Sequence, residues 1–335
     1  MKEIFTVDPF LGMNPDKPGE VCNLVKGKWL QSKNFREDIV DPLNGGNFLR
    51  VPDTVDYSEF MENLDICSKS GLHNPLKNIE RYLMLGDVCA KAAELLREEE
   101  VSEYFTKLIQ RVMPKSTSQC HGEVTVTRVF LENFSGDNVR FLARSFSNPG
   151  DHLGQESSGY RWPFGPVCII APFNFPLEIP ALQAMGALFM GNRPLVKVDS
   201  RVSVVFEQFL RLLIHCGLPP EDLDFINCKG EVMEELIKQS NNKIRLTQFT
   251  GSKEVADKLS VVLKGKIRIE DAGFDWKIIG PDYDSEWTEY VANQCDQDAY
   301  NASGQKCSAQ SILFVHRNWE EDLLPRLADL ASNRE

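Results

Sequence analysis

The sequence predicts an α/β protein built around a parallel sheet. Between residues 164 and 269, short apolar runs of strand length alternate with stretches of helical periodicity, at the spacing of successive βαβ units. The chain has 335 residues, of which 42% are hydrophobic and 20 are Phe, so it is too apolar to remain disordered. Its length predicts about two domains.

The first half of the chain precedes this alternation. Residues 1–75 are polar and rich in turns, whereas residues 77–147 carry helical periodicity. A third helical stretch is expected over 131–146, with Gly136 as a possible interruption. Residues 148–163 are polar and contain glycine, which predicts a loop or an exposed hairpin.

The alternating part predicts five strands and four helices. The strands are expected at residues 167–170, 194–198, 223–226, 245–249 and 266–270. The helices are expected at residues 177–190, 202–213, 231–239 and 252–263.

Charge and cysteine content exclude several classes of function. The chain has 37 Lys plus Arg against 49 Asp plus Glu and shows no basic patch, so nucleic acid is not an expected partner. The most apolar stretch, residues 164–191, is broken by four prolines, so no membrane span is expected. Nine scattered cysteines without a Cys-x-x-Cys pair argue against disulfides and a cysteine-rich zinc site; we expect a reducing compartment and no metal.

Polar residues follow the predicted strands. In a parallel α/β sheet, ligands bind beyond the carboxyl ends of the strands. These ends carry Asn174, Lys197, the turn Thr250-Gly251-Ser252 and Glu270. The turn could bind a phosphate at a helix N-terminus, although Gly-x-Gly-x-x-Gly is absent. The alternatives are a plain helix cap at Ser252, an edge-strand charge at Lys197 and a surface carboxylate at Glu270.

Cys307 differs from the other cysteines in its neighbours. It lies in the polar segment Ser303-Gly304-Gln305-Lys306-Cys307-Ser308, beside a cation, which is a setting for a thiolate. Cys168 and Cys216 lie in apolar periodic segments and are expected in the core.

Four motifs together resemble the aldehyde dehydrogenase superfamily, and within it the plant-type pyrroline-5-carboxylate dehydrogenases. They are Pro172-Phe173-Asn174-Phe175-Pro176, Phe249-Thr250-Gly251-Ser252, the stretch Glu270-Asp271-Ala272-Gly273-Phe274-Asp275-Trp276-Lys277, and Ser303-Gly304-Gln305-Lys306-Cys307-Ser308-Ala309. The resemblance implies a Rossmann-type NAD domain followed by the N-terminal part of an α/β catalytic domain. It divides the chain into an N-terminal part of the NAD domain (1–147), a loop or oligomerisation hairpin (148–163), the NAD-binding core (164–269) and a partial catalytic domain (270–335).

The resemblance also implies roles for single residues. Cys307 would be the nucleophile, Asn174 an oxyanion donor and Glu270 the base that activates water. Ser308 would bind the carboxylate of the substrate. NAD would be held by a larger set, namely Pro172, Phe173, Lys197, Asp199, Thr250, Gly251, Ser252 and Val255. Asp199 would disfavour NADP by repelling its 2′-phosphate.

The implied reaction is oxidation of L-glutamate 5-semialdehyde to L-glutamate in proline breakdown. The small-molecule aldehyde would be the substrate, the full-length family implies a homo-oligomer, and relatives are mitochondrial matrix enzymes. The first residues show no presequence, so a cytoplasmic location is the alternative.

Three departures from the family pattern affect these expectations. Phe173 replaces the commoner Trp, and Ala256 replaces a Gly usual after the phosphate turn. The chain stops at Glu335, before the Glu-x-Phe-Gly-Pro motif that binds the nicotinamide ribose, so slow turnover is expected. An inactive or nucleotide-binding-only chain is therefore the main alternative, and a cysteine hydrolase using Cys307 with His316 is a remote one.

Overall fold

The computed structural model describes residues 4–66, 78–240 and 243–334, and these divide into two compact units, Met1–Glu270 and Asp271–Glu335. Cys67 and the end of the turn-rich segment, residues 67–75, lie outside the described residues. No helix of the described ranges is both long and apolar enough to cross a membrane.

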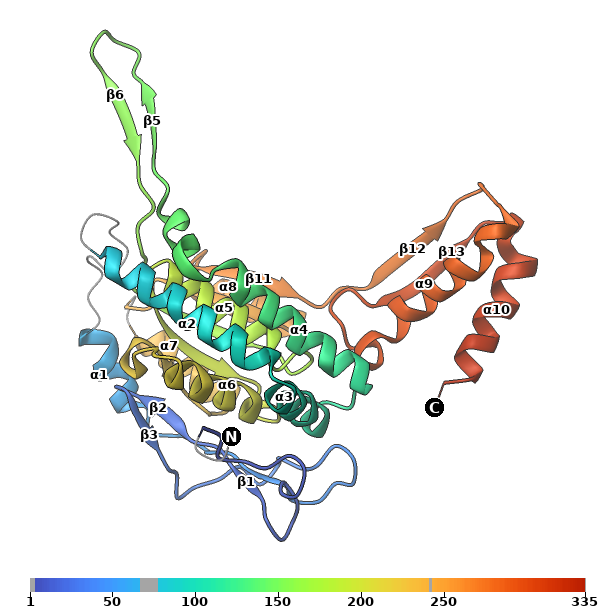
Figure 1. Ribbon diagram of the computed structural model, residues 1–335, viewed down its shortest axis with the longest axis horizontal. Helices are drawn as coiled ribbons and strands as arrows, with labels where there is room; N and C mark the ends of the chain where they lie inside the picture. The colour runs from blue at the N-terminus through green and yellow to red at the C-terminus, as the bar shows by residue number, and fades with distance from the viewer. Residues whose placement is uncertain (1–3, 67–77, 241–242, 335) are drawn as a thin grey trace. The chain divides into compact units, whose positions relative to one another are not determined.

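A seven-stranded sheet forms the centre of the first unit within the described residues (Figure 1). From one edge to the other its strands are β11 (Ile267–Asp271), β10 (Leu246–Gly251), β7 (Pro166–Ala171), β8 (Arg193–Val198), β9 (Asp224–Phe225), β2 (Asn23–Val25) and β3 (Lys28–Leu30). Strands β10, β7, β8 and β9 are parallel, and β2 and β3 extend the sheet in antiparallel pairs. The predicted parallel α/β class is therefore confirmed.

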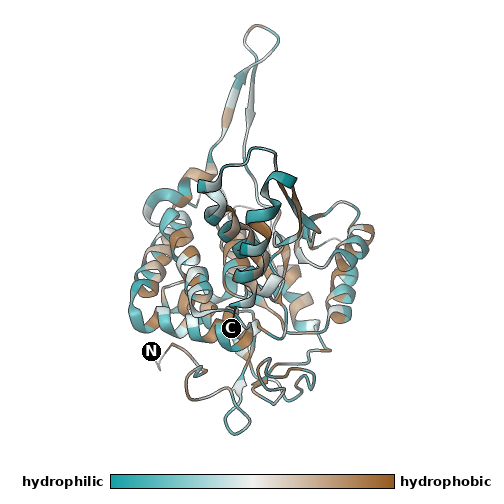
Figure 2. Ribbon diagram, turned by 90° about the vertical axis from the view of Figure 1, so that its right-hand side faces the viewer, coloured by the Kyte–Doolittle hydropathy of each residue, from teal (hydrophilic) through white to brown (hydrophobic). Residues whose placement is uncertain are grey.

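Helices cover both faces of this sheet. Phe60 of α1 and Leu236 of α7 pack with Ile226 on one face. Phe225 points to the other face because neighbouring strand residues alternate, and there it contacts Phe206 of α6. Hydrophilic and hydrophobic residues alternate around the outer helices (Figure 2). The helices of the first unit are α1 (Ser58–Ile66), α2 (Ile79–Arg97), α3 (Glu99–Val112), α4 (Thr117–Asn133), α5 (Glu178–Phe189), α6 (Ser203–His215), α7 (Gly230–Gln239) and α8 (Lys253–Leu263).

The third helical stretch predicted over residues 131–146 is interrupted at Gly136, as the sequence suggested, and the prediction is wrong at Phe146. Helix α4 ends at Asn133, and Gly136, with φ +61°, starts the separate 3₁₀ segment η1 (Gly136–Ala143). Phe146 then begins a hairpin of β5 (Phe146–Pro149) and β6 (Glu156–Gly159), two residues before the predicted range. The hairpin projects from the body of its unit (Figure 1).

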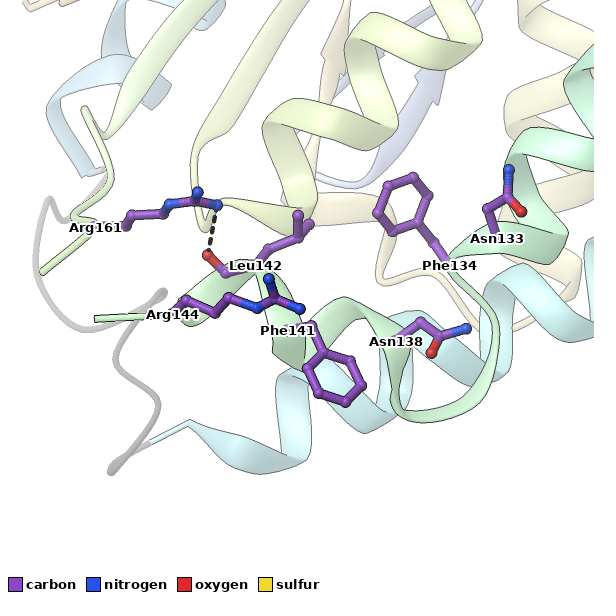
Figure 3. Close-up of a pocket in the computed structure, with 7 residues that line it drawn as sticks. All are labelled: Asn133, Phe134, Asn138, Phe141, Leu142, Arg144 and Arg161. Carbon is purple, nitrogen blue, oxygen red and sulfur yellow. Dashed lines mark hydrogen bonds between the residues drawn. The ribbon is translucent and has the colours of Figure 1, made fainter. Parts of the chain in front are cut away.

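A pocket of about 440 Å³ lies near the base of this hairpin (Figure 3). It has two arginines, two asparagines and three apolar side chains in its wall: Asn133, Phe134, Asn138, Phe141, Leu142, Arg144 and Arg161. Arg161 donates a hydrogen bond of 3.0 Å to the carbonyl of Leu142. None of the residues that the sequence assigns to the active site lines this pocket.

The second unit contains a two-stranded parallel sheet of β12 (Asp275–Ile279) and β13 (Gln310–Val315). Helices α9 (Thr288–Tyr300) and α10 (Glu320–Ser332) pack on one face, where Ala292 and Leu323 are fully buried. The other face is apolar and exposed, with Trp276 and Ile278 each 62% accessible.

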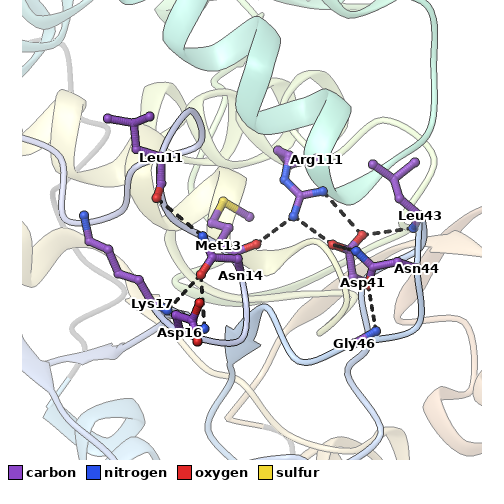
Figure 4. A network of polar contacts seen from close by, with 10 residues as sticks. All are labelled: Leu11, Met13, Asn14, Asp16, Lys17, Asp41, Leu43, Asn44, Gly46 and Arg111. Carbon is purple, nitrogen blue, oxygen red and sulfur yellow. Dashed lines mark hydrogen bonds and ion pairs between the residues drawn. The ribbon is translucent and has the colours of Figure 1, made fainter.

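The turns of the N-terminal segment, which also holds β1 (Gly19–Glu20) and β4 (Leu49–Arg50), are attached to α3 through Arg111. Its guanidinium binds the buried carboxylate of Asp41 at 2.8 Å and the carbonyl of Met13 at 2.7 Å (Figure 4). Burial opposes ionisation of Asp41, but the hydrogen bonds from Arg111 and from the Leu43 amide prevail and hold the Asp41 pKa below its ordinary value. One ion pair therefore fixes loops that are far apart in sequence.

The lowered pKa of Asp41 predicts a pH-dependent contribution to stability. The stabilisation is fully present above the unfolded-state pKa and is lost as the pH falls through the lower native pKa. Asp41→Asn should lower the free energy of unfolding by about 2 kcal/mol at pH 7, and this difference should shrink below about pH 4. Urea unfolding across that pH range checks it, with Asp151→Asn in the exposed hairpin loop as the control. A pH-independent difference would contradict the ion-pair explanation.

Candidate active site

The polar residues predicted at the strand ends of the first unit share one edge of its sheet. Phe249 of β10 pairs with Ile170 of β7, and Ile170 pairs with Lys197 of β8. The three strands therefore end at the same level, and the residues that follow them emerge together. This register brings the loop after β7, the end of β8 and the turn after β10 to a common edge.

Asn174 lies in the loop between β7 and α5 and is buried, with 7% of its surface accessible. The neighbouring ring of Phe173 faces the guanidinium of Arg201 at 4.7 Å. This cation–π contact holds one side of the loop. A side-chain amide fixed in a buried loop can act as a preorganised hydrogen-bond donor.

Lys197 lies in β8, which pairs with a strand on each side. The alternative that Lys197 is an edge-strand charge is therefore wrong. Its ammonium approaches the Val198 carbonyl at 3.4 Å, so the side chain reaches the carboxyl end of the sheet. Sequence alone could not separate these cases, because an interior strand and an edge strand have the same local pattern.

The turn after β10 combines a buried and an exposed part. Thr250 is buried and accepts a hydrogen bond of 2.9 Å from Gln183 of α5. A Cβ on Gly251 would lie 2.8 Å from the Phe249 ring, so this position requires glycine. Ser252 and Val255 are exposed at the start of α8, and in the described structure the Ser252 side chain makes no capping hydrogen bond. The first amides of α8 and the Ser252 hydroxyl therefore suit a phosphate group.

Asp199 follows β8 directly and forms a two-point ion pair with Arg201, with hydrogen bonds of 2.9 and 2.7 Å. Burial opposes its charge, but the bonds and charge of Arg201 keep the Asp199 pKa below its ordinary value. The carboxylate is thus ionised, and a cation that is itself 59% accessible in its side chain offsets its charge. Repulsion of a 2′-phosphate by Asp199 is correspondingly weaker than the sequence suggested.

Glu270 is exposed in β11, beside β10. This position places it on the edge strand at the end of the first unit. Its exposure also fits the alternative of a surface carboxylate.

Cys307 and Ser308 belong to the second unit, in the turn before β13. Cys307 is half-buried and Ser308 is exposed. Upstream, Ala302, Ser303 and Gly304 have φ values of 51°, 56° and 74°, three consecutive residues in the left-handed region. Two non-glycine residues in this region store backbone strain, which often marks a functional loop.

The other cysteines of the described ranges are buried: Cys22, Cys89, Cys120, Cys168, Cys216, Cys228 and Cys295. Burial raises the thiol pKa of Cys22, Cys120, Cys216 and Cys228 to about 11 and that of Cys89 to about 12. These thiols are poor nucleophiles at neutral pH because the reactive form is the thiolate. In the described parts of the chain, no three His, Cys, Asp or Glu side chains gather in a way that could hold a metal ion.

A largely parallel sheet with polar residues gathered at its carboxyl edge is typical of α/β enzymes that bind a ligand there. The sequence profile of the aldehyde dehydrogenase family matches residues 80–334. The chain belongs to this family.

Individual relatives agree with this assignment. The chain is 59% identical to the mitochondrial Delta-1-pyrroline-5-carboxylate dehydrogenase 12A1 of Arabidopsis thaliana, over 95% of the chain and 57% of that protein. It is 24% identical to a malonate-semialdehyde dehydrogenase of Listeria innocua, over 93% of the chain and 62% of the relative. The chain thus spans about three fifths of the length of these relatives.

Solved structures share the fold. A Brucella melitensis aldehyde dehydrogenase superposes with a TM-score of 0.81 at 21% identity, covering 94% of this chain and 63% of that one. An NADP-dependent enzyme of E. coli gives a TM-score of 0.80 at 18% identity, covering 99% and 64%.

The exposure of the cysteines predicts which one reacts first. Substoichiometric iodoacetamide at pH 8 should alkylate Cys307 before any other described cysteine, because Cys307 alone among them is not buried. Peptide mapping by mass spectrometry identifies the modified residue. Cys307→Ser should remove the fast phase, and Cys295→Ser, a buried thiol of the same unit, should retain it. Fast labelling of a buried thiol would contradict this assignment.

Proposed function

We propose that the chain carries the NAD-dependent oxidation of L-glutamate 5-semialdehyde, the open form of pyrroline-5-carboxylate, to L-glutamate. The observation that carries this proposal is the 59% identity to a protein named as a pyrroline-5-carboxylate dehydrogenase. The strand-edge residues of the first unit and the half-buried Cys307 support it.

In the proposed reaction, the Cys307 thiolate attacks the aldehyde carbon and forms a thiohemiacetal. The Asn174 amide donates a hydrogen bond to the developing oxyanion. Bound NAD supplies the hydride acceptor, so that the aldehyde is oxidised and a thioester remains on Cys307. Glu270 takes a proton from water, which attacks the thioester, releases glutamate and regenerates the thiol. Ser308 would donate a hydrogen bond to the substrate carboxylate.

The residues at the sheet edge fit a dinucleotide. The start of α8 offers amides and the exposed Ser252 hydroxyl to a pyrophosphate, with Gly251 allowing close approach. Lys197 would bind the adenosine ribose, and Pro172, Phe173, Thr250 and Val255 would complete the cofactor wall. We propose NAD as the preferred cofactor because Asp199 is ionised and occupies Arg201, a cation that would otherwise attract a 2′-phosphate.

The proposal extends to assembly and location. We propose a homo-oligomer with the β5–β6 hairpin as a candidate contact, since its strands are fully or partly exposed. A mitochondrial location is proposed on the name of the Arabidopsis relative, and the matrix is the compartment that the family resemblance implies.

A chain that binds nucleotide without turnover is the second candidate. It is favoured by one observation: the residues proposed for NAD all lie in the first unit, whereas Cys307 lies in the second. NAD titration together with an NADH assay separates the two candidates. NAD affinity without NADH formation would support binding alone.

The ion pair between Asp199 and Arg201 predicts how cofactor preference can be changed. Asp199→Asn should raise NADP affinity relative to NAD by about tenfold, because it frees a guanidinium that can pair with a 2′-phosphate. Fluorescence titration with both cofactors measures this ratio. Asp137→Asn removes an exposed carboxylate that pairs with Arg140 in η1, and serves as the control. An unchanged ratio would remove Asp199 and Arg201 from the specificity argument.

The different roles proposed for Cys307 and Glu270 predict different kinetics for variants at these two positions. Cys307→Ser should abolish NADH formation from glutamate semialdehyde. Glu270→Gln should release about one equivalent of NADH per chain and then stop, because hydride transfer precedes the step that needs the base. Stopped-flow absorbance at high chain concentration detects this burst, with Glu94→Gln on the exposed side of α2 as the control. Steady wild-type turnover by Glu270→Gln would refute the role of the base.

A further inference from the structure

A fully buried ion pair lies behind the loop that carries Asn174. Lys115, in the connection from α3 to α4, and Glu123, within α4, have side chains that are 1% and 0% accessible. The Lys115 Nζ atom lies 2.9 Å from Glu123 Oε2. Two charges buried this deeply are costly unless their remaining hydrogen-bonding capacity is used.

The second carboxylate oxygen of Glu123 binds backbone amides at the start of α5. Glu123 Oε1 accepts hydrogen bonds from the backbone amides of Leu177 at 2.8 Å and Glu178 at 3.1 Å. These are the first amides of α5, which need partners from outside the helix. Leu177 is the N-cap residue of α5, and its apolar side chain cannot accept a hydrogen bond. Glu123 therefore caps a helix that begins 55 residues later in the chain.

Lys115 also contacts the loop that carries Asn174, through the aromatic ring of Phe175. Its Nζ atom lies 3.8 Å from the centroid of the Phe175 ring. Phe175 and Phe173 flank Asn174, and Phe173 lies under the Arg201 guanidinium. Asn174 is thus placed between two aromatic rings that each face a cation, and the loop ends at amides held by Glu123.

We propose that the pair of Lys115 and Glu123 is a positioning element for the Asn174 amide. It fixes the start of α5 and the Phe175 ring, and through them the direction in which Asn174 donates to the oxyanion. The pair has no net charge, so its effect on the reaction is geometric. This inference rests on the proposed function, because it assigns Asn174 a role in catalysis.

The test combines two readouts on the whole chain. Glu123→Gln keeps the shape and an accepting oxygen but leaves Lys115 without its carboxylate. We expect faster hydrogen exchange at the Leu177 and Glu178 amides. We also expect first-turnover NADH formation to slow on the order of 10- to 100-fold, with NAD affinity unchanged. The double variant Lys115→Met with Glu123→Gln removes both charges and should recover part of the rate, which separates positioning from misfolding.

A double-mutant cycle with Asn174→Ala tests whether the pair acts through Asn174. In that background, Glu123→Gln should cause little further loss of rate, because the donor it positions is already gone. Glu207→Gln is the matched control. Glu207 is also a fully buried carboxylate that pairs with an arginine, Arg211, and accepts a backbone amide, that of Cys22 at 3.1 Å. Its effects on the rate should be additive with Asn174→Ala.

Each outcome has one meaning. Additive losses for Glu123→Gln and Asn174→Ala, or unchanged exchange at Leu177 and Glu178, would overturn the positioning role while the proposed function stands. A wild-type rate in Asn174→Ala would overturn the oxyanion role and the inference with it. Absence of NADH from the wild-type chain, with NAD bound, would instead overturn the proposed function.

Discussion

The candidate site of the first unit depends on one constraint, which is that strands β10, β7 and β8 end at the same level of the sheet. Parallel strands in this register deliver three chain segments, which are separate in sequence, to one edge of the sheet. A shift of one residue in β8 would turn Lys197 to the opposite face of the sheet. Both faces of β8 are packed, so such a shift would make the buried Leu195 and Val196 exchange faces and would disrupt the core on both sides of the sheet. Core packing therefore sets the geometry of the polar edge.

Hydrophobic periodicity predicted the strands and helices between residues 166 and 271 because the core imposes that periodicity. It failed where burial ceases. Phe146 looked like the end of a helix, yet it is 64% exposed in a hairpin, so its apolar side chain carried no information about a core. The edge-strand alternative for Lys197 failed for a related reason. The strands that pair with a given strand can come from distant parts of the chain. Strand β8 pairs with β9, although helix α6 separates the two in sequence.

In the candidate site too, some residues could be predicted from their neighbours in sequence, whereas some contacts depend on the fold. Cys307 could be selected from its polar neighbours, and Asn174, Thr250 and Glu270 from their places after strands. The contact between Glu123 and the amides of Leu177 and Glu178 could not, because no local signal links residues so far apart. The pairing of Asp199 with Arg201 was also hidden, although the two lie close in sequence. Whether a nearby cation binds a carboxylate or points away from it depends on the fold around them.

The contrast between the two units bears on how a covalent mechanism can be built. An oxyanion donor is most effective when it is already oriented before the charge develops, since reorientation would cost part of the stabilisation. Asn174 meets this requirement through buried contacts on both sides of its loop. A nucleophile has a different requirement, because it must reach the substrate carbon, form a bond and later release the acyl group. Cys307, the proposed nucleophile, lies in a half-buried turn that follows three residues in the left-handed region, whereas the loop of Asn174 is buried. A buried donor and a more accessible nucleophile are therefore consistent with the thioester mechanism proposed above.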